Sequence, residues 1–118
     1  MELFDTTQLA LSAALRGSDA RQSALAGNLA NVDTPGYVRK DVDFHGALQA
    51  ALDSGENAGS VNFIAQDDSA APVRADGNSV DADAESSALS QNALEYDALA
   101  KVASTRIDIL KTAMGVSP

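Results

Sequence analysis

The acidic residues that follow position 80 are the first candidates for chemistry. Asp81, Asp83 and Glu85 alternate with other residues, as carboxylates do in calcium-binding loops. Such a loop also needs a glycine at its sixth position and a glutamate at its twelfth. Here Gly77 precedes the carboxylates, and no glutamate follows at that distance. We therefore interpret the carboxylates as a helix start, where they complement the helix dipole, and predict no metal site.

His45 is the only histidine, and Asp41 and Asp43 lie close to it in the chain. No serine stands in the G-x-S-x-G turn that exposes a nucleophile, and no phosphate-binding glycine loop or H-E-x-x-H pair occurs. Cysteine is absent, which excludes thiolate nucleophiles and thiolate metal sites. We predict no catalytic residue and no cofactor, and we interpret His45 as a surface or packing residue.

The charge balance limits the partners. Seventeen acidic residues face eight basic ones, giving a net charge of −9, which disfavours nucleic acid and direct lipid binding. Arg16, Arg21, Arg39 and Lys40 form a small basic cluster. It suits pairing with acidic residues of neighbouring subunits or an ordinary solvated face. No apolar run approaches the length of about 18 residues needed for a membrane helix, and the acidic N-terminus is unlike a cleaved secretion signal.

Two long helices are needed to position these residues. Residues 6–31 favour the first, with Thr6 or Thr7 as its N-cap. Residues from about 79 to 114 favour the second, which Gly115 ends. Both show spacings that alternate between four and three, the period of a coiled-coil seam. The first seam is Leu11, Leu15, Ser18, Gln22, Leu25, Leu29 and Val32. The second is Leu89, Ala93, Tyr96, Ala100, Ala103, Ile107, Leu110 and Met114.

A sharp corner follows the first helix. Pro35 disfavours helix at the residue before it, and Pro-Gly at 35–36 favours a type II turn. Asn31 suits a left-handed position at the helix end. Beyond the corner we expect a short helix over 44–52 and a strand over 61–65.

The predicted fold is therefore mainly α. Long N- and C-terminal helices pair as a coiled-coil core, with a small irregular or β middle insert. We divide the chain into 1–36 (core helix and corner), 37–79 (insert) and 80–118 (second core helix), as one domain formed by both termini. The seams are rich in small and polar residues, which bury little apolar area. We infer that the lone chain is marginally stable and is completed by helices of other chains.

Four segments resemble a known family. Asn28-Leu29-Ala30-Asn31-x-x-Thr34-Pro35-Gly36-Tyr37 is similar to the signature of bacterial flagellar rod and hook-type axial proteins. The other three resemble the proximal-rod branch of that family in particular. They are Arg39-Lys40-Asp41-Val42-Asp43-Phe44, the run Asp76-Gly77-Asn78-Ser79-Val80-Asp81-x-Asp83-x-Glu85, and Asn92-Ala93-Leu94-x-Tyr96.

The resemblance implies a structural subunit of the basal-body rod without enzymatic activity. It implies terminal helices paired as a coiled coil, and partners that include other copies of the chain, other rod proteins and the rod-ring adaptor FliE. It also implies a rod that crosses the periplasm and passage through the flagellar type III export apparatus without a cleaved signal. Phe44 and Leu48 fit a motif that the export gate reads. Asn28, Asn31, Thr34, Pro35, Gly36 and Tyr37 would form the corner and contact neighbouring subunits.

Two alternatives remain open from the sequence. Another axial rod protein would share the helices and the corner, although the run from Asp76 to Glu85 argues against it. A soluble helical adaptor or export chaperone would instead be a stable folded dimer at micromolar concentration.

Overall fold

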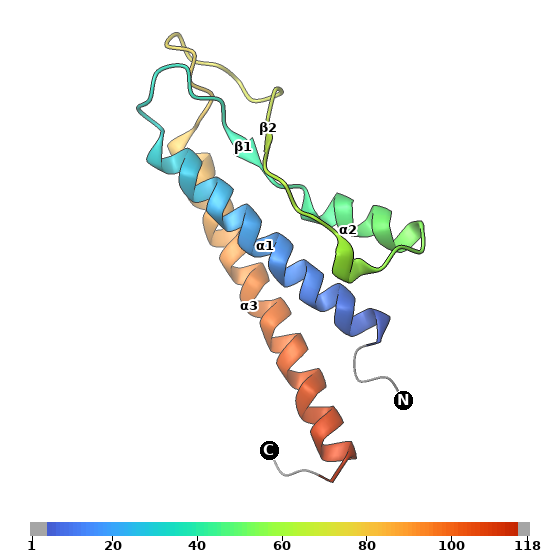
Figure 1. Cartoon of the computed structure of the whole chain (residues 1–118). Helices are drawn as coiled ribbons and strands as arrows, with labels where there is room; N and C mark the ends of the chain where they lie inside the picture. Colours follow the sequence, from blue (N-terminus) through green and yellow to red (C-terminus); the bar gives the residue numbers. More distant parts are fainter. Residues whose placement is uncertain (1–4, 116–118) are drawn as a thin grey trace.

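Two long antiparallel helices dominate the molecule. The computed structural model describes residues 5–115, so the N-terminal residues considered as a signal, 1–4, lie outside the described part. Helix α1 spans Thr6–Ala30 and helix α3 spans Ala82–Ala113. They run side by side along a molecule of 62 × 31 × 14 Å (Figure 1). The mainly helical fold predicted from the sequence is confirmed.

Side chains close the ends of α1. Asp5 is the N-cap, since its carboxylate accepts a hydrogen bond from the Gln8 N–H at 2.9 Å. The predicted caps, Thr6 and Thr7, are helical instead, so that prediction is wrong. Asn31 is the C-cap with φ −104°, outside the left-handed region predicted for it. Its side-chain N–H donates to the Gly27 carbonyl at 2.8 Å and so closes the last turn without a left-handed residue.

The ends of α3 follow the sequence signals more closely. Asp81 is the N-cap and accepts hydrogen bonds from the Asp83 and Ala84 N–H groups. Gly115 follows the last turn with φ +78°, a left-handed conformation that glycine adopts without strain. The predicted stop at this glycine is confirmed.

The middle of the chain forms a thin layer on α1. It contains strand β1 (Lys40–Asp41), helix α2 (Phe44–Asp53), a 3₁₀ turn η1 (Ala58–Ser60) and strand β2 (Gln66–Asp67). The two strands pair antiparallel, with Lys40 opposite Asp67. The short helix is confirmed, but the strand predicted over 61–65 is wrong. Because α2 begins at Phe44, β1 is too short to reach that segment, and pairing stops at Gln66.

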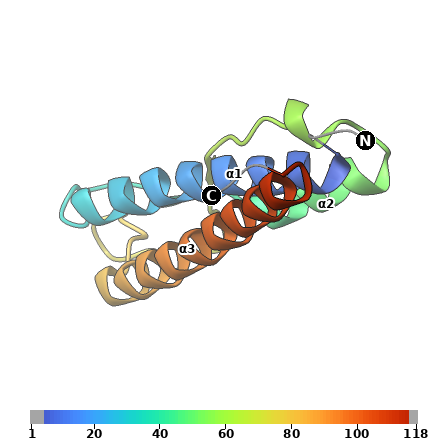
Figure 2. The ribbon, with the colours of Figure 1, turned by 90° about the horizontal axis from the view of Figure 1, so that it is seen from below.

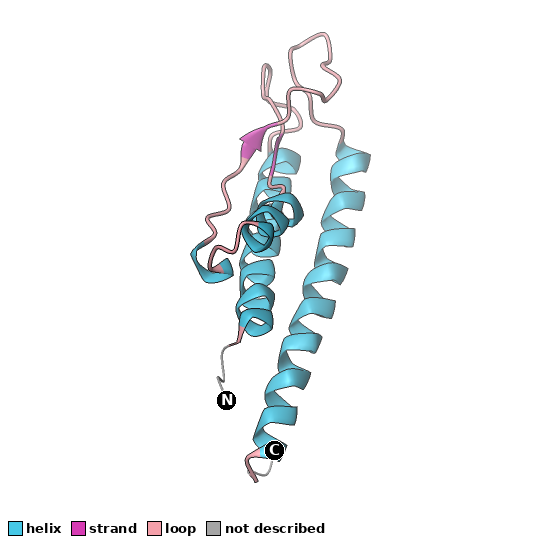
Figure 3. Cartoon of the chain, turned by 90° about the vertical axis from the view of Figure 1, so that its right-hand side faces the viewer, coloured by secondary structure: helices cyan, strands magenta, loops and turns pink. Residues whose placement is uncertain are grey.

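Helix α1 lies between α3 and this middle layer (Figures 1 and 3). The middle layer is anchored by Phe44 and Val42, which are almost fully buried and pack with Ala14 of α1. Gly17 allows this approach, since a Cβ atom there would lie only 2.5 Å from the Phe44 Cβ. A glycine in the middle of α1 is thus explained by the packing of α2.

Helices α1 and α3 lie side by side (Figure 2), and polar side chains link them at several points. Ser18 of α1 and Asn92 of α3 are almost fully buried where the two helices meet. The Asn92 side-chain N–H groups donate to the Ser18 carbonyl and to the Gln22 side chain, each at 2.8 Å. Further along, Arg106 pairs with Asp5 at 3.0 Å. Because this pair lies at the start of α1, the last turns of α3 extend beyond it (Figure 1).

Candidate functional site

The corner after α1 is a type II turn, as predicted. The Tyr37 N–H donates to the Thr34 carbonyl at 3.2 Å, and Gly36 has φ +76°, the conformation that the third residue of such a turn requires. The Gly36 N–H donates to the Asp76 carbonyl at 2.9 Å. The turn is therefore tied to a second loop about forty residues away. We call the two loops, 31–37 and 74–79, the corner clasp.

Asn78 is the centre of the corner clasp. Its side chain is completely buried. The side-chain amide donates to the carbonyls of Asn31, Val32 and Thr34 at 2.8–3.1 Å. These three carbonyls lie just beyond α1, which ends at Ala30, so Asn78 fixes the backbone of the first loop to the second. Its own carbonyl oxygen accepts the Val80 N–H at 2.7 Å, which directs the chain into α3.

Asn28 ties α1 to β1. This fully buried side chain donates to the Lys40 carbonyl at 2.7 Å and accepts the Lys40 N–H at 2.8 Å. The pair of bonds imitates the pairing of one strand with another. Asn28 also donates to Glu85 at 3.2 Å and accepts from the Tyr37 hydroxyl at 3.4 Å. One amide therefore connects α1, the corner, β1 and α3.

Arg39 and Glu85 form an ion pair beside Asn28. The Glu85 side chain is only 2% exposed, and the Arg39 guanidinium bonds both to it and to Asp68. The hydrogen bond that Arg39 donates to Glu85 raises the pKa of Arg39 above its ordinary value. The sequence indicated only a dipole role for Glu85; the structure adds a buried partner. Two sequence segments that matched the family signature thus meet in one polar network.

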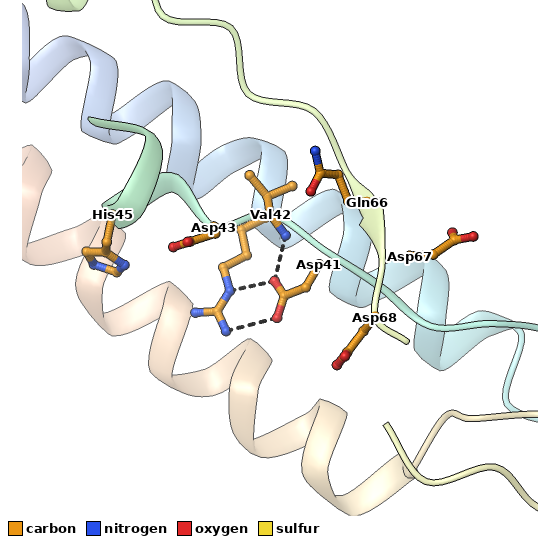
Figure 4. A pocket seen from close by; sticks show the side chains of 8 residues that line it. Asp41, Val42, Asp43, His45, Gln66, Asp67 and Asp68 are labelled. Carbon is orange, nitrogen blue, oxygen red and sulfur yellow. Dashed lines mark hydrogen bonds and ion pairs between the residues drawn. The ribbon is translucent and has the colours of Figure 1, made fainter. Parts of the chain in front are cut away.

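The basic cluster is satisfied within the chain. Arg21 pairs with Asp41 at 2.9 Å beside a hollow lined largely by aspartates (Figure 4). Lys40 pairs with Asp67 at 2.7 Å, and Arg16 donates to two backbone carbonyls. These cations therefore have partners within their own chain, and pairing with neighbouring subunits, one of our two interpretations, is not needed to satisfy them.

The same hollow holds the residues first considered for catalysis. His45 is exposed and contacts Glu95 of α3, which confirms its interpretation as a surface residue. Within residues 5–115, no group of three or more acidic or histidine side chains is arranged to hold a metal ion. In the same part of the chain, no helix is both long and apolar enough to span a membrane.

The remaining predicted site residues lie in three different environments. Of the corner residues, Thr34, Pro35 and Gly36 are exposed, whereas Asn31 and Tyr37 are half-buried. Phe44 is buried and Leu48 is half-buried against the same core. The seams divide between contact and exposure. Leu25 and Ala103 are buried, Leu11, Leu15, Leu29, Leu89 and Leu110 are half-buried, and Tyr96, Ile107 and Met114 are 41%, 43% and 57% exposed.

Sequence reasoning missed the side chains that hold the corner together. Asn78, Arg39 and Arg74 were not predicted as site residues. Arg74 donates to the Val32 and Val80 carbonyls and so closes the corner clasp from outside. A signal was present in the sequence, because Asn78 lies within the segment from Asp76 to Glu85 that resembled the axial family. That resemblance did not show that the segment folds back onto the first.

The comparisons agree with this geometry. A family model described as "Flagella basal body rod protein" matches residues 6–37, which are α1 and the corner. The paired terminal helices and the corner clasp agree with the class that this model describes, a structural protein of the flagellar basal-body rod. Membership in this class implies assembly with other rod components.

Full-length relatives identify the family. The chain is 30% identical to the flagellar basal body rod protein FlgB of Bacillus subtilis, over 97% of both chains. It is 30% identical to FlgB of Aeromonas hydrophila over 86% of both, and 34% identical to FlgB of Escherichia coli over 64% of this chain and 69% of that protein. The chain belongs to the FlgB family. This membership sets aside the adaptor and chaperone interpretation.

Proposed function

We propose that this rod subunit assembles through the apolar seam residues of α3 that its own α1 leaves uncovered. The observation that carries the proposal is the exposure of Tyr96, Ile107 and Met114 on α3. These residues belong to the seam predicted from the sequence, yet α3 turns Asn92 and Glu85 toward α1 instead. Apolar residues at heptad spacing are the contacts that pair helices. Helices of neighbouring rod subunits, including other copies and the adaptor FliE, would cover them.

The test compares two substitutions on different faces of α3. Ile107→Asp should abolish incorporation into the rod and motility, because it places a carboxylate within the proposed helix contact. Leu94→Asp is the matched control, since Leu94 is 70% exposed and lies outside the seam. Incorporation is measured by immunoblotting of isolated basal bodies. Normal incorporation of the Ile107→Asp chain would contradict the proposal.

We further propose that the exposed part of the corner contacts a neighbouring subunit. Thr34, Pro35 and Gly36 protrude while the corner clasp holds their backbone. Gly36→Val should strain the turn, because its φ of +76° is unfavourable for a β-branched residue. A Cβ atom at this position would meet nothing within 4 Å, so the effect would come from the backbone alone. Normal motility of this variant would exclude the corner role.

A last proposal concerns export. Phe44 and Leu48 would be read by the type III export gate before α2 packs, since Phe44 is 1% exposed in the folded chain. Leu48→Asn should therefore reduce secretion of the chain. Leu52→Asn is the control on the same helix, because Leu52 is 38% exposed and lies outside the motif. Equal secretion of both variants would refute the motif.

A further inference from the structure

One side of α3 carries a stripe of residues whose spacing alternates between four and three, the period at which helices pair. All of its members except Ala100 are exposed, and Ala100 is half-buried. Its two large apolar residues, Ile107 and Met114, are 43% and 57% exposed. The stripe consists of Ala93, Asp97, Ala100, Ser104, Ile107, Lys111 and Met114. We call it the open stripe.

The open stripe is complementary to itself when its direction is reversed. Each small residue near one end corresponds to a large apolar residue near the other end, and the acid corresponds to the base. The matched residues are Ala93 with Met114, Asp97 with Lys111, and Ala100 with Ile107, while Ser104 stands alone at the centre. Two copies of the stripe laid antiparallel would therefore set small side chains against large ones, which lets facing helices interdigitate.

The two charged residues of the open stripe have no ionic partner within the described chain. Neither Asp97 nor Lys111 takes part in an ion pair among residues 5–115, and Lys101, one turn beyond Asp97, takes part in none either. Asp97 lines a hollow between α1 and α3 together with Asp19 of α1. A lysine that entered this hollow would meet a carboxylate from each helix, and such complementarity of charge selects a partner and its orientation.

We propose that the open stripe pairs two free copies of the chain antiparallel, about a twofold axis at Ser104. Lys111 of each copy would enter the hollow beside Asp97 and Asp19 of the other copy. A parallel pair is disfavoured, because it would place Asp97 against Asp97 and Lys111 against Lys111. From Ala93 to Met114 the contact would run along about 32 Å of helix. It uses one surface twice and closes after two copies.

This pairing would cover Ile107 and Met114, which the proposed rod contact also uses. A chain would then either pair or enter the rod, but not both at once. This consequence rests on the proposed function, whereas the pairing itself does not. Pairing is measured with the purified chain and incorporation with isolated basal bodies, so that failure of one proposal is distinguished from failure of the other.

The absence of cysteine permits a direct test. Ser104→Cys places one thiol of each chain at the proposed twofold axis. On oxidation, the purified Ser104→Cys chain should form a disulfide-linked dimer about tenfold faster than a control, because pairing holds the two thiols together. Val102→Cys is the matched control, since Val102 is 50% exposed and residues two apart do not share a helix face. Equal rates for the two chains would overturn the proposal.

Charge exchange within the Ser104→Cys chain tests the direction of the pair. Lys111→Asp should slow cross-linking to the control rate, because two carboxylates would then face each other, and Asp97→Lys should do the same with two ammonium groups. Both substitutions together should restore fast cross-linking, since opposite charges meet again. Both positions are exposed, and circular dichroism checks that each variant keeps its helices. Single exchanges that leave the rate unchanged, as in a parallel pair, or a double exchange that stays slow, would contradict the antiparallel contact.

Discussion

Replacement of Asn78 tests whether the corner clasp stabilises the fold. Its side chain is completely buried, and its two N–H groups serve three carbonyls while its oxygen accepts the Val80 N–H. Asn78→Ala would remove all of these contacts without adding bulk. Asn78→Asp would keep the shape but would turn a carboxylate oxygen toward the same three carbonyls.

The expected loss follows from the number of bonds. Two donors and one acceptor amount to about three hydrogen bonds, each contributing roughly 0.5–1.5 kcal/mol. Asn78→Ala should therefore lower the free energy of unfolding by about 3 kcal/mol. Asn78→Asp should lower it further, since oxygen then faces oxygen without a proton between them.

Urea unfolding followed by circular dichroism at 222 nm measures both variants. With a slope of about 1.5 kcal/mol per M, the Asn78→Ala midpoint should fall by about 2 M. Asn62→Ala is the control, because Asn62 is exposed and the side chain makes no hydrogen bond with described residues; its effect should stay within about 0.5 kcal/mol. A loss for Asn78→Ala below that value would refute the clasp as a source of stability.

Three further predictions concern packing and charge. Gly17→Ala should destabilise the chain by about 1–3 kcal/mol, since its Cβ would overlap Phe44, whereas Gly27→Ala, with nothing nearer than 3.9 Å, should stabilise it by about 0.5–1 kcal/mol; equal urea midpoints would refute this. Arg39→Met should cost about 3–5 kcal/mol by leaving Glu85 buried without its partner, and Arg39→Met with Glu85→Leu should recover much of the loss; no recovery would contradict the ion-pair argument. Burial of Asp41 opposes its ionisation, but hydrogen bonds from Arg21 and the Val42 N–H outweigh burial and lower the pKa of Asp41 below 3.8. The ionised Asp41 therefore stabilises the fold fully above about pH 5, and this stabilisation is lost as the pH falls through the lowered pKa. Urea unfolding at pH 7 and pH 3 should show a smaller loss of stability at pH 3 for Asp41→Asn than for the unchanged chain, and an equal loss would count against this prediction.

The long helices and the corner could be predicted because their signals are local. Gly36 occupies the one position of a type II turn that demands a positive φ, and Gly115 ends α3 by the same property. The short helix after Phe44 also follows from neighbouring residues. The network around Asn28 and Glu85 could not be predicted, because it joins residues 57 positions apart.

The face that α3 turns toward α1 was also beyond prediction from spacing. Apolar periodicity indicated Ile107 and Met114 for the helix contact, but both are exposed, and the side of α3 that meets α1 includes the polar Asn92 and Glu85. A periodic pattern shows which apolar residues favour burial against another helix. It does not show whether that helix belongs to the same chain. The predicted seams therefore stay a prediction about assembly.

The polar contacts between α1 and α3 have a mechanical consequence for a subunit of a rod. Side chains as small as alanine and serine offer little obstacle when one helix is pushed along another. Here three ties are spread along the pair, at Asp5–Arg106, Ser18–Asn92 and Asn28–Glu85. Each tie is directional and short, so a displacement of one turn breaks all three together. An axial load on α3 is therefore shared along the length of α1 and does not concentrate in the segment 31–81 that joins the two helices.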